Sequence, residues 1–275
     1  MMRLRLIPKK KLALFLACLL ALFSAPALLL YARLHRVGHR ASGASGNGSR
    51  MQGYPRLFLW AWERPEDLDF IDPQRVGVAF LSRTIYLQGD KVIERPRMQP
   101  LKVAPATTLI AVVRIEAVRD NRPTLSASQR AETVAALTRA ARAPKVSALQ
   151  IDFDALESER EFYKSLLLEL RPRLPQGMPL SITALASWCI YDNWLDGLPV
   201  DEAVPMLFRM GVDEGHIKSY LKEGGEFRSP LCRLSSGLST DEPLKLASPP
   251  ARTYIFHTKS WTKDSVRSAL ERNPE

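Results

Sequence analysis

Short apolar runs alternate with amphipathic helical stretches from about residue 55 to the end of the chain. Eight of these runs have the length and the β-branched or aromatic content of buried strands. They lie at 56–62, 75–81, 107–117, 146–154, 179–186, 202–208, 227–234 and 252–258. Regular alternation of this kind is typical of a parallel sheet whose strands are connected by helices.

Three clear helical patterns lie at 126–142, 156–174 and 262–272. The first begins at a serine and the last at a threonine, and both residue types are favoured N-caps. The middle one begins acidic and ends basic, which suits the helix dipole. Shorter helices are expected at 192–198 and 213–222.

Residues 84–98 predict a β-hairpin inserted after the second strand, with Gly89 and Asp90 in its turn. Eight strands with helices between them, in about 220 residues, predict a slightly irregular (β/α)8 TIM-like barrel of the α/β class. An open doubly wound sheet is the alternative. The chain has neither the G-x-G-x-x-G motif nor the P-loop expected of a nucleotide-binding sheet, so we favour the barrel.

The N-terminal part of the chain predicts a membrane anchor. Residues 12–32 carry no charge and are long enough to cross a bilayer as a helix. The basic flank at 1–11 favours a cytoplasmic N-terminus, and a Gly/Ser-rich tether at 33–53 leads to the barrel domain at 54–275. We therefore expect a single-pass inner-membrane protein whose C-terminal domain lies in the periplasm or outside the cell.

A cleaved signal peptide is the alternative to the anchor, because Ala25-Pro26-Ala27 matches an A-x-A cleavage site. The apolar run continues for five residues past that site, which favours an uncleaved anchor. A lipoprotein modified at Cys18 fits less well, since only six apolar residues precede it. Both main alternatives predict that the body of the protein is exported.

The net charge of +10 belongs to the N-terminal segment. Residues 1–50 hold nine of the 39 Lys and Arg residues and none of the 29 Asp and Glu residues. The remaining chain has 30 basic against 29 acidic residues and is close to neutral. It lacks the basic surface that a nucleic-acid-binding protein requires, so no nucleic-acid partner is expected.

Cys189 and Cys232 are the only cysteines after residue 50. An oxidising compartment would permit a disulfide between them, but two separate buried thiols fit the sequence equally well. The four histidines show no metal-ligand spacing. Neither a metal nor another cofactor is expected, and the sequence gives no indication of oligomeric state or protein partners.

Two aspartates at the end of the fourth strand are the main candidates for chemistry. Along 148–154 the apolar odd-numbered residues share one face, while Gln150, Asp152 and Asp154 share the other. We expect the polar face to point into the barrel at the C-terminal ends of the strands, where active sites of this fold lie. The alternative for Asp154 is to cap the helix that follows.

Other strand ends add further candidates. Arg114 and Glu116 share a face at the end of the third strand, where Arg114 is a candidate for ligand binding and Glu116 a candidate catalytic carboxylate that could pair with Asp152. The alternative is an ion pair between the two. Glu63 follows the first strand and is a further candidate carboxylate. The candidates for ligand binding, for which core packing is the alternative, are Trp60, Trp62, Trp188, Tyr191, Arg209 and His257. Aromatic side chains and carboxylates at one rim predict a cleft that stacks on sugar rings.

Four segments carry a resemblance to a known family: "LFLWAWERPEDLDFI", "ALQIDFDA", "LSITALASWC" and "VPMLFRMG". Together they resemble the uncharacterised bacterial proteins grouped as domain-of-unknown-function family 3142, over most of residues 55–262. The resemblance implies an exported barrel with the architecture of glycoside hydrolases. That family has no settled activity, so the resemblance implies no catalytic residues.

A looser similarity connects "QIDFDAL" with the D-x-x-D-x-D-x-E strand of chitinase-like hydrolases. Leu149 stands at the first aspartate of that motif and Leu156 at its catalytic glutamate, while Glu157 lies one residue too far along. We therefore expect a glycoside-hydrolase-like barrel that acts on or binds a carbohydrate of the cell envelope or of an exopolysaccharide. The alternative is a non-catalytic glycan- or protein-binding envelope domain, and the substrate and its linkage are not indicated.

Overall fold

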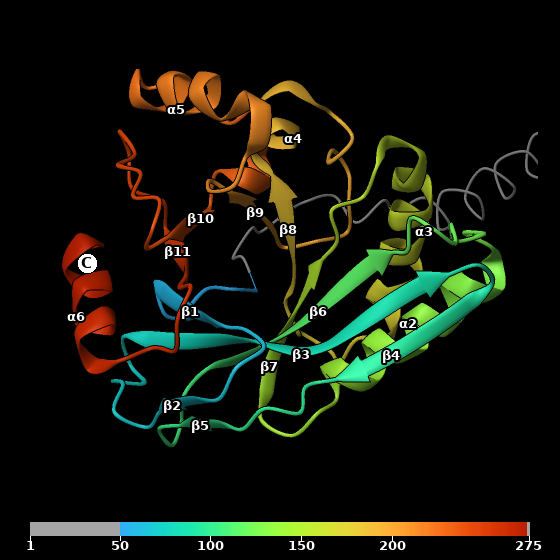
Figure 1. The fold of residues 1–275 in the computed structure, drawn as a ribbon, viewed down its shortest axis with the longest axis horizontal. Helices are drawn as coiled ribbons and strands as arrows, with labels where there is room; N and C mark the ends of the chain where they lie inside the picture. The colour runs from blue at the N-terminus through green and yellow to red at the C-terminus, as the bar shows by residue number, and fades with distance from the viewer. Residues whose placement is uncertain (1–49, 274–275) are drawn as a thin grey trace, which may run out of the picture. The chain divides into compact units, whose positions relative to one another are not determined.

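The computed structural model of the protein describes residues 50–273, in which eight parallel strands form a closed ring (Figure 1). The ring closes because β1 (Leu57–Ala61) pairs with both β3 (Val76–Gln88) and β11 (Arg252–Phe256). The strands between them, in order around the ring, are β6 (Leu109–Ala117), β7 (Val146–Asp152), β8 (Leu180–Leu185), β9 (Glu202–Met206) and β10 (Ser235–Ser239). The predicted TIM-like barrel is confirmed, and the open sheet is excluded.

Helices and short 3-10 turns connect the strands on the outside of the barrel (Figure 1). The helices are α2 (Ala127–Ala141), α3 (Arg160–Leu170), α4 (Ala186–Tyr191), α5 (Glu214–Lys222) and α6 (Lys263–Arg272). The turns are η1 (Glu157–Glu159), η2 (Arg171–Arg173), η3 (Gly211–Asp213) and η4 (Pro230–Cys232). The Ser126 hydroxyl accepts the Gln129 N–H at 3.2 Å, and the Thr262 hydroxyl accepts the Ser265 N–H at 3.2 Å, so both predicted N-caps are confirmed.

Two of the predicted helices differ in extent or position. The pattern at 156–174 becomes a short α3 with a 3-10 turn at each end, and Pro172 lies in the turn that ends it, because proline cannot continue the helical hydrogen bonding. The expected helix at 192–198 is wrong: these residues form turns, and α4 comes immediately before them.

The second barrel strand continues beyond the barrel as one arm of a hairpin. β3 is 13 residues long, and its second half pairs antiparallel with β4 (Lys91–Pro96), with Gln88 opposite Lys91. Gly89 and Asp90 form the connection between the two arms. The hairpin is thus an extension of β3 itself. A separate parallel pair joins β2 (Glu66–Leu68) to β5 (Leu101–Val103).

The expected seventh strand at 227–234 is wrong, because the strand is β10, with the sequence Ser-Ser-Gly-Leu-Ser. This segment has one apolar side chain and gives almost no strand signal. Its glycine has a steric reason: a Cβ on Gly237 would lie 2.8 Å from Cη2 of Trp60. The apolar residues of 227–234 instead lead into and form η4, next to a disulfide.

A column of aromatic rings fills the interior of the barrel. Tyr254 stacks on Phe58 at 5.2 Å and on Trp60 at 5.4 Å between ring centroids. Trp60 contacts Phe208 at 6.2 Å, and Phe208 stacks on Phe256 at 5.6 Å. Large rings of this kind fit inside an eight-stranded barrel only where facing positions are small. Besides Gly237, Gly77 on the neighbouring strand β3, in register with Phe58, is small, and a side chain there would overlap the ring of Phe58.

A buried ion pair lies beside the end of this column that is nearest the N-terminal ends of the strands. Arg252 donates to the Glu202 carboxylate at 2.9 Å, and the Tyr254 hydroxyl donates to the same carboxylate at 2.5 Å. Glu202 has no exposed surface. Arg252 also donates to the backbone carbonyl of Met51 at 2.8 Å, so the same cluster fixes the first described residues at the N-terminal end of the barrel.

We expect the substitution Glu202→Gln to lower the free energy of unfolding by about 3–5 kcal/mol, because it leaves the buried Arg252 guanidinium without a counter-charge. Urea unfolding followed by tryptophan fluorescence measures this loss. The matched control is Glu223→Gln on the exposed surface, with an expected change within about 0.5 kcal/mol. Equal effects of the two substitutions would contradict a stabilising role for the buried pair.

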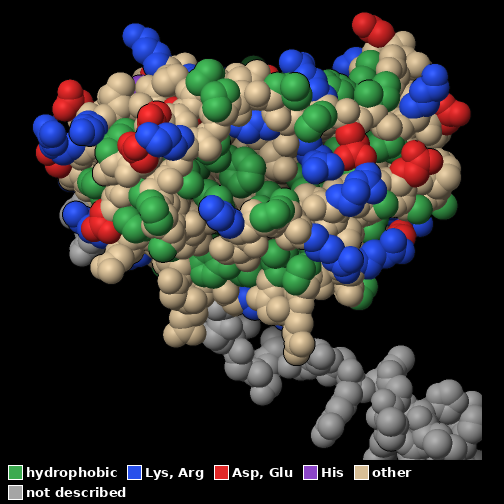
Figure 2. Space-filling view, turned by 90° about the horizontal axis from the view of Figure 1, so that it is seen from below, with side chains coloured by type: hydrophobic (Ala, Val, Ile, Leu, Met, Phe, Trp, Pro, Cys, Tyr) green, Lys and Arg blue, Asp and Glu red, His purple; other side chains and the backbone are tan. Residues whose placement is uncertain are grey.

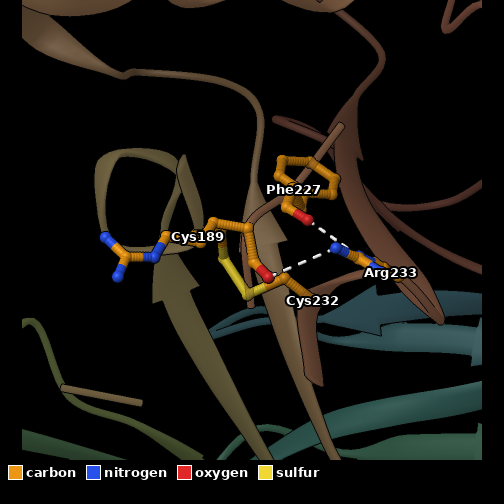
Figure 3. The surroundings of a disulfide bond; sticks show 5 residues. Cys189, Phe227, Cys232 and Arg233 are labelled. Atoms are coloured by element: carbon orange, nitrogen blue, oxygen red, sulfur yellow. Dashed lines mark hydrogen bonds between the residues drawn. A yellow bond between two sulfur atoms is a disulfide. The ribbon is translucent and has the colours of Figure 1, made fainter. Parts of the chain in front are cut away.

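The two cysteines of the barrel domain form a disulfide between α4 and η4 (Figure 3). Their Cα atoms are 5.9 Å apart across a sequence separation of 43 residues. The carbonyl of Cys189 accepts the Arg228 N–H at 2.8 Å, and the Arg233 side chain donates to the Phe227 carbonyl at 2.8 Å. The bond therefore fixes α4, the helix that follows β8, to the segment before β10.

We expect the double substitution Cys189→Ser with Cys232→Ser to lower stability by about 3–4 kcal/mol, the loop-entropy value for a ring of this size. Thermal unfolding with and without a reducing agent measures the effect. The reductant should lower the melting temperature of the wild type but leave that of the double variant unchanged. A wild type that is insensitive to reductant would contradict the pairing.

Charged side chains of both signs are interspersed on the face shown in Figure 2, among exposed apolar ones. No single-sign patch dominates this face, in keeping with the near-neutral composition of the chain after residue 50. The predicted anchor and tether at 12–53 lie outside the described residues, except for 50–53. Within residues 50–273, no helix is both long and apolar enough to cross a membrane.

Candidate functional site

A cavity of about 310 Å³ opens at the C-terminal ends of the barrel strands. Its wall is formed by strand ends and by the first residues of the segments that follow them. The lining residues are Trp60, Trp62, Arg114, Asp152, Asp154, Thr183, Leu185, Ala186, Ser187, Met206, Phe208, Arg209, Met210, Ile217 and Phe256. This end of the barrel is where enzymes of this fold place their active sites.

Asp152 is the last residue of β7 and points into the barrel. Only 7% of its surface is exposed, and the Thr183 hydroxyl on β8 donates to its carboxylate at 2.7 Å. Burial, and then the negative charge of Asp154, raise the pKa of Asp152 to about 6, although Thr183 and Arg114 act in the opposite direction. A buried carboxyl group with such a pKa can hold a proton near neutral pH and release it to a substrate.

Asp154 lies two residues beyond Asp152, on the same face and at the rim of the same cavity. Its carboxylate makes no hydrogen bond or ion pair with any residue in 50–273, so the alternative role of Asp154 as a helix cap is wrong: the Leu156 N–H donates to Glu159 at 2.8 Å. The surrounding protein raises the pKa of Asp154 by desolvation, while the nearby charge of Arg114 lowers it. The carboxylate is therefore free to contact a ligand.

The predicted alternation of side chains along β7 is confirmed by the contacts of both faces. Phe153 packs outward against Tyr163 of α3, with ring centroids 5.1 Å apart. On the inner face, Gln150 accepts the indole N–H of Trp60 at 2.9 Å and donates to Ser181 at 3.0 Å. This satisfied polar layer lies one step below Asp152 and closes the floor of the site.

Arg114 and Glu116 form an ion pair at 2.7 Å, and each side chain is a little more than one third exposed. Arg114 also lines the cavity, whereas Glu116 does not. The Arg114 charge favours the ionised form of both aspartates. The Arg114 side chain thus lines the cavity, while the Glu116 carboxylate binds it from outside the cavity.

The wall opposite the aspartates is aromatic. β11 lies four strands away from β7 in the ring of eight, so Phe256 at its end faces the carboxylates across the mouth. Phe208 stacks on Phe256 with an angle of 6° between the rings, and Trp62 packs edge-on against Phe256 at 6.3 Å. Planar apolar rings opposite carboxylates are suited to stack on a sugar while its polar edge faces the charged groups.

Several side chains singled out from the sequence lie outside this cavity. Trp188 is buried in the core, edge-on to Trp194 at 4.8 Å, because α4 begins directly after β8 and turns the chain away. Tyr191 is exposed beside His216. The remaining two are Glu63, which lines a separate small cavity, and His257, whose ring bonds to Thr240 at 2.6 Å.

Sequence reasoning missed Thr183, Phe208 and Phe256 among the lining residues. A signal for each was present in its position: Thr183 lies in the second half of β8, Phe208 two residues past β9 and Phe256 at the end of β11, and all three line the cavity. Without the strand register, however, inward and outward faces could be assigned only on β7, where polar and apolar positions alternate clearly.

Within residues 50–273, no group of three or more His, Cys, Asp or Glu side chains is placed to hold a metal ion. The two aspartates of the site have a threonine and an arginine as neighbours instead of further metal ligands. The chemistry that this arrangement can perform directly is proton transfer and stabilisation of charge.

Comparison with known proteins gives little further identification. No protein-family model matches the chain, and no curated protein matches it. Among solved structures, the spore cortex-lytic enzyme SleL of Bacillus cereus is similar, with a TM-score of 0.42 and 17% identity. The match covers 79% of this chain and 58% of that one, so the chain spans less than two thirds of that protein's length. A likeness this distant carries no functional argument, and the resemblance to family 3142 stays a prediction.

We expect the substitution Asp152→Asn to stabilise the protein at pH 7 but not near pH 4. The folded chain holds the Asp152 proton up to a pKa of about 6, while the unfolded chain releases it near 3.8, so wild-type stability falls as pH rises between these values. The difference between these two pKa values corresponds to about 3 kcal/mol in the free energy of unfolding, and an asparagine side chain does not titrate in this range. Urea unfolding from pH 4 to pH 7 measures it, and a gain independent of pH would contradict the raised pKa.

Proposed function

We propose that this protein is an exported, membrane-anchored, glycoside-hydrolase-like barrel that acts on a carbohydrate of the cell envelope or of an exopolysaccharide. The observation that carries the proposal is the cavity at the barrel mouth, where two carboxylates of unequal environment face an aromatic wall. Hydrolysis of a glycosidic bond needs a protonated acid and a second carboxylate beside it. The apolar segment 12–32 supports the anchor, and the four family-like segments support membership of family 3142.

In this proposal Asp152 is the general acid. It is buried, its pKa of about 6 leaves it about half protonated at pH 6 and about one-tenth protonated at pH 7, and the bond from Thr183 fixes the orientation of its carboxyl group. The acid would protonate the oxygen of the glycosidic bond as that bond breaks. A sugar ring beside the scissile bond would stack on Trp62, which lines the cavity, while Phe256 supports Trp62 edge-on.

Asp154 is the second carboxylate. It is more exposed than Asp152 and has no partner within residues 50–273, so it can reach the sugar or a water molecule. Arg114 favours its charged form, which is required for attack on the sugar or for activation of water. Two neighbouring carboxyl groups with different environments thus divide the acid role from the nucleophile or base role.

We expect Asp152→Asn to lower hydrolysis of any glycan cleaved by the wild type by about 100-fold or more, since the proton donor is removed. Release of reducing ends from a panel of envelope and extracellular polysaccharides measures the activity. Wild-type kcat/KM should fall as pH rises through about 6, where Asp152 loses its proton. The matched control Asp90→Asn, in the exposed hairpin turn, should keep full activity. Undiminished hydrolysis by the Asp152 variant would reject this assignment.

A non-catalytic glycan-binding domain is the second candidate function. The observation that favours it is Leu156, which stands where chitinase-like hydrolases carry their catalytic glutamate and is 49% exposed. Two other glutamates of this region are engaged, because Glu159 accepts the backbone N–H of Leu156 and Glu116 pairs with Arg114. Glycan binding without turnover by the wild type would select this candidate over the hydrolase.

A further inference from the structure

Arg209 at the cavity rim has an unusual backbone conformation. It follows the end of β9 and lines the same cavity as the two aspartates. Its φ of 52° lies in the left-handed region, which costs energy for a residue with a side chain. The Glu242 carboxylate holds this conformation by accepting the Arg209 N–H at 3.1 Å. The protein thus fixes one particular direction for the arginine side chain.

The guanidinium of Arg209 lies over the ring of Phe256, with its central carbon 5.2 Å from the ring centroid. It forms no ion pair and no side-chain hydrogen bond with any residue in 50–273, and it is exposed. Its acidic neighbours have other partners: Asp241 accepts from Ser239, and Glu242 also approaches Lys218 at 3.9 Å. Stacking on the ring leaves the N–H groups at the edge of the guanidinium free for an anion.

The other arginine of the cavity is not equivalent. Arg114 is paired with Glu116 at 2.7 Å and lies on β6, next to the strand that carries the aspartates. Arg209 follows β9, two strands along the ring from β7. An anionic group held by Arg209 would therefore project away from Asp152 and Asp154, whose negative charge would otherwise repel it.

We infer that Arg209 binds an acidic substituent of the glycan, a carboxylate or a phosphate, and so makes the site selective for acidic over neutral sugars. This inference rests on the proposed function and names its substrate class. The guanidinium fork matches either oxygen acid with two parallel hydrogen bonds, and stacking on Phe256 holds the fork in place. An uncharged hydroxymethyl group could form neither an ion pair with the guanidinium nor the two parallel hydrogen bonds.

The test uses full-length protein in detergent and sets of three oligosaccharides that differ only at C6. In each set the first member carries a hydroxymethyl group, the second a carboxylate and the third a phosphate ester, and sets are made for several backbone linkages. Calorimetric titration gives the ratio of acidic to neutral affinity. We expect the wild type to prefer an acidic member by about tenfold or more, and the preferred acid identifies which group is recognised.

The substitution Arg209→Gln should bring this ratio close to one, and Arg209→Lys should give an intermediate ratio, because lysine keeps the charge but not the fork. The matched control is Arg56→Gln, an exposed arginine preceding β1 at the other end of the barrel, which should keep the wild-type ratio. An unchanged ratio in the Arg209→Gln variant, or a wild type that prefers the neutral member, overturns the inference alone. If no member of any set binds, the proposed function fails and the inference fails with it.

Discussion

The interior of the barrel depends on one steric constraint: large aromatic rings must share the axis of an eight-stranded ring. Phe58, Trp60 and Tyr254 stack there, and the nearby strands β3 and β10 supply Gly77 and Gly237 where any side chain would overlap the rings. Aliphatic side chains of other strands, among them Val112, Ala148 and Val204, pack with these rings into one buried cluster. Beside these rings, the Glu202 carboxylate is paired with the Arg252 guanidinium and with the Tyr254 hydroxyl.

The electrostatics of the candidate site follow from this packing. Because the floor is closed by Trp60 and the bonded Gln150, Asp152 loses most of its contact with water, and its pKa rises. Asp154, one step higher, keeps more exposure. A difference of two positions along a single strand therefore separates a buried carboxyl group with a pKa of about 6 from a more exposed one, whose pKa burial raises and the charge of Arg114 lowers. The aromatic column continues into the mouth as Phe208 and Phe256, which give the site its apolar wall.

The sequence predicted those parts of the fold whose signal is local. The caps at Ser126 and Thr262, and the alternation of polar and apolar residues along β7, were readable because each depends on neighbouring residues alone. β10 was missed because its sequence has little hydrophobic pattern. Its central glycine is required by the ring of Trp60, a residue far away in the sequence. Trp188 was assigned to the rim because the abrupt start of α4 after β8 has no strong sequence signal.

By itself the sequence determined the barrel class, the near-neutral charge after residue 50, and the inward direction of Asp152 and Asp154. Only the tertiary structure decided which other side chains meet them, because residues from β6 to β11 approach one another through ring closure and not through spacing along the chain. It paired Cys189 with Cys232, and Arg114 with Glu116, while leaving the Arg209 guanidinium without an acidic partner in residues 50–273. Hydrophobic periodicity specifies which face of a strand is buried, whereas the partners across the barrel are set by register and by the volume that the rings occupy.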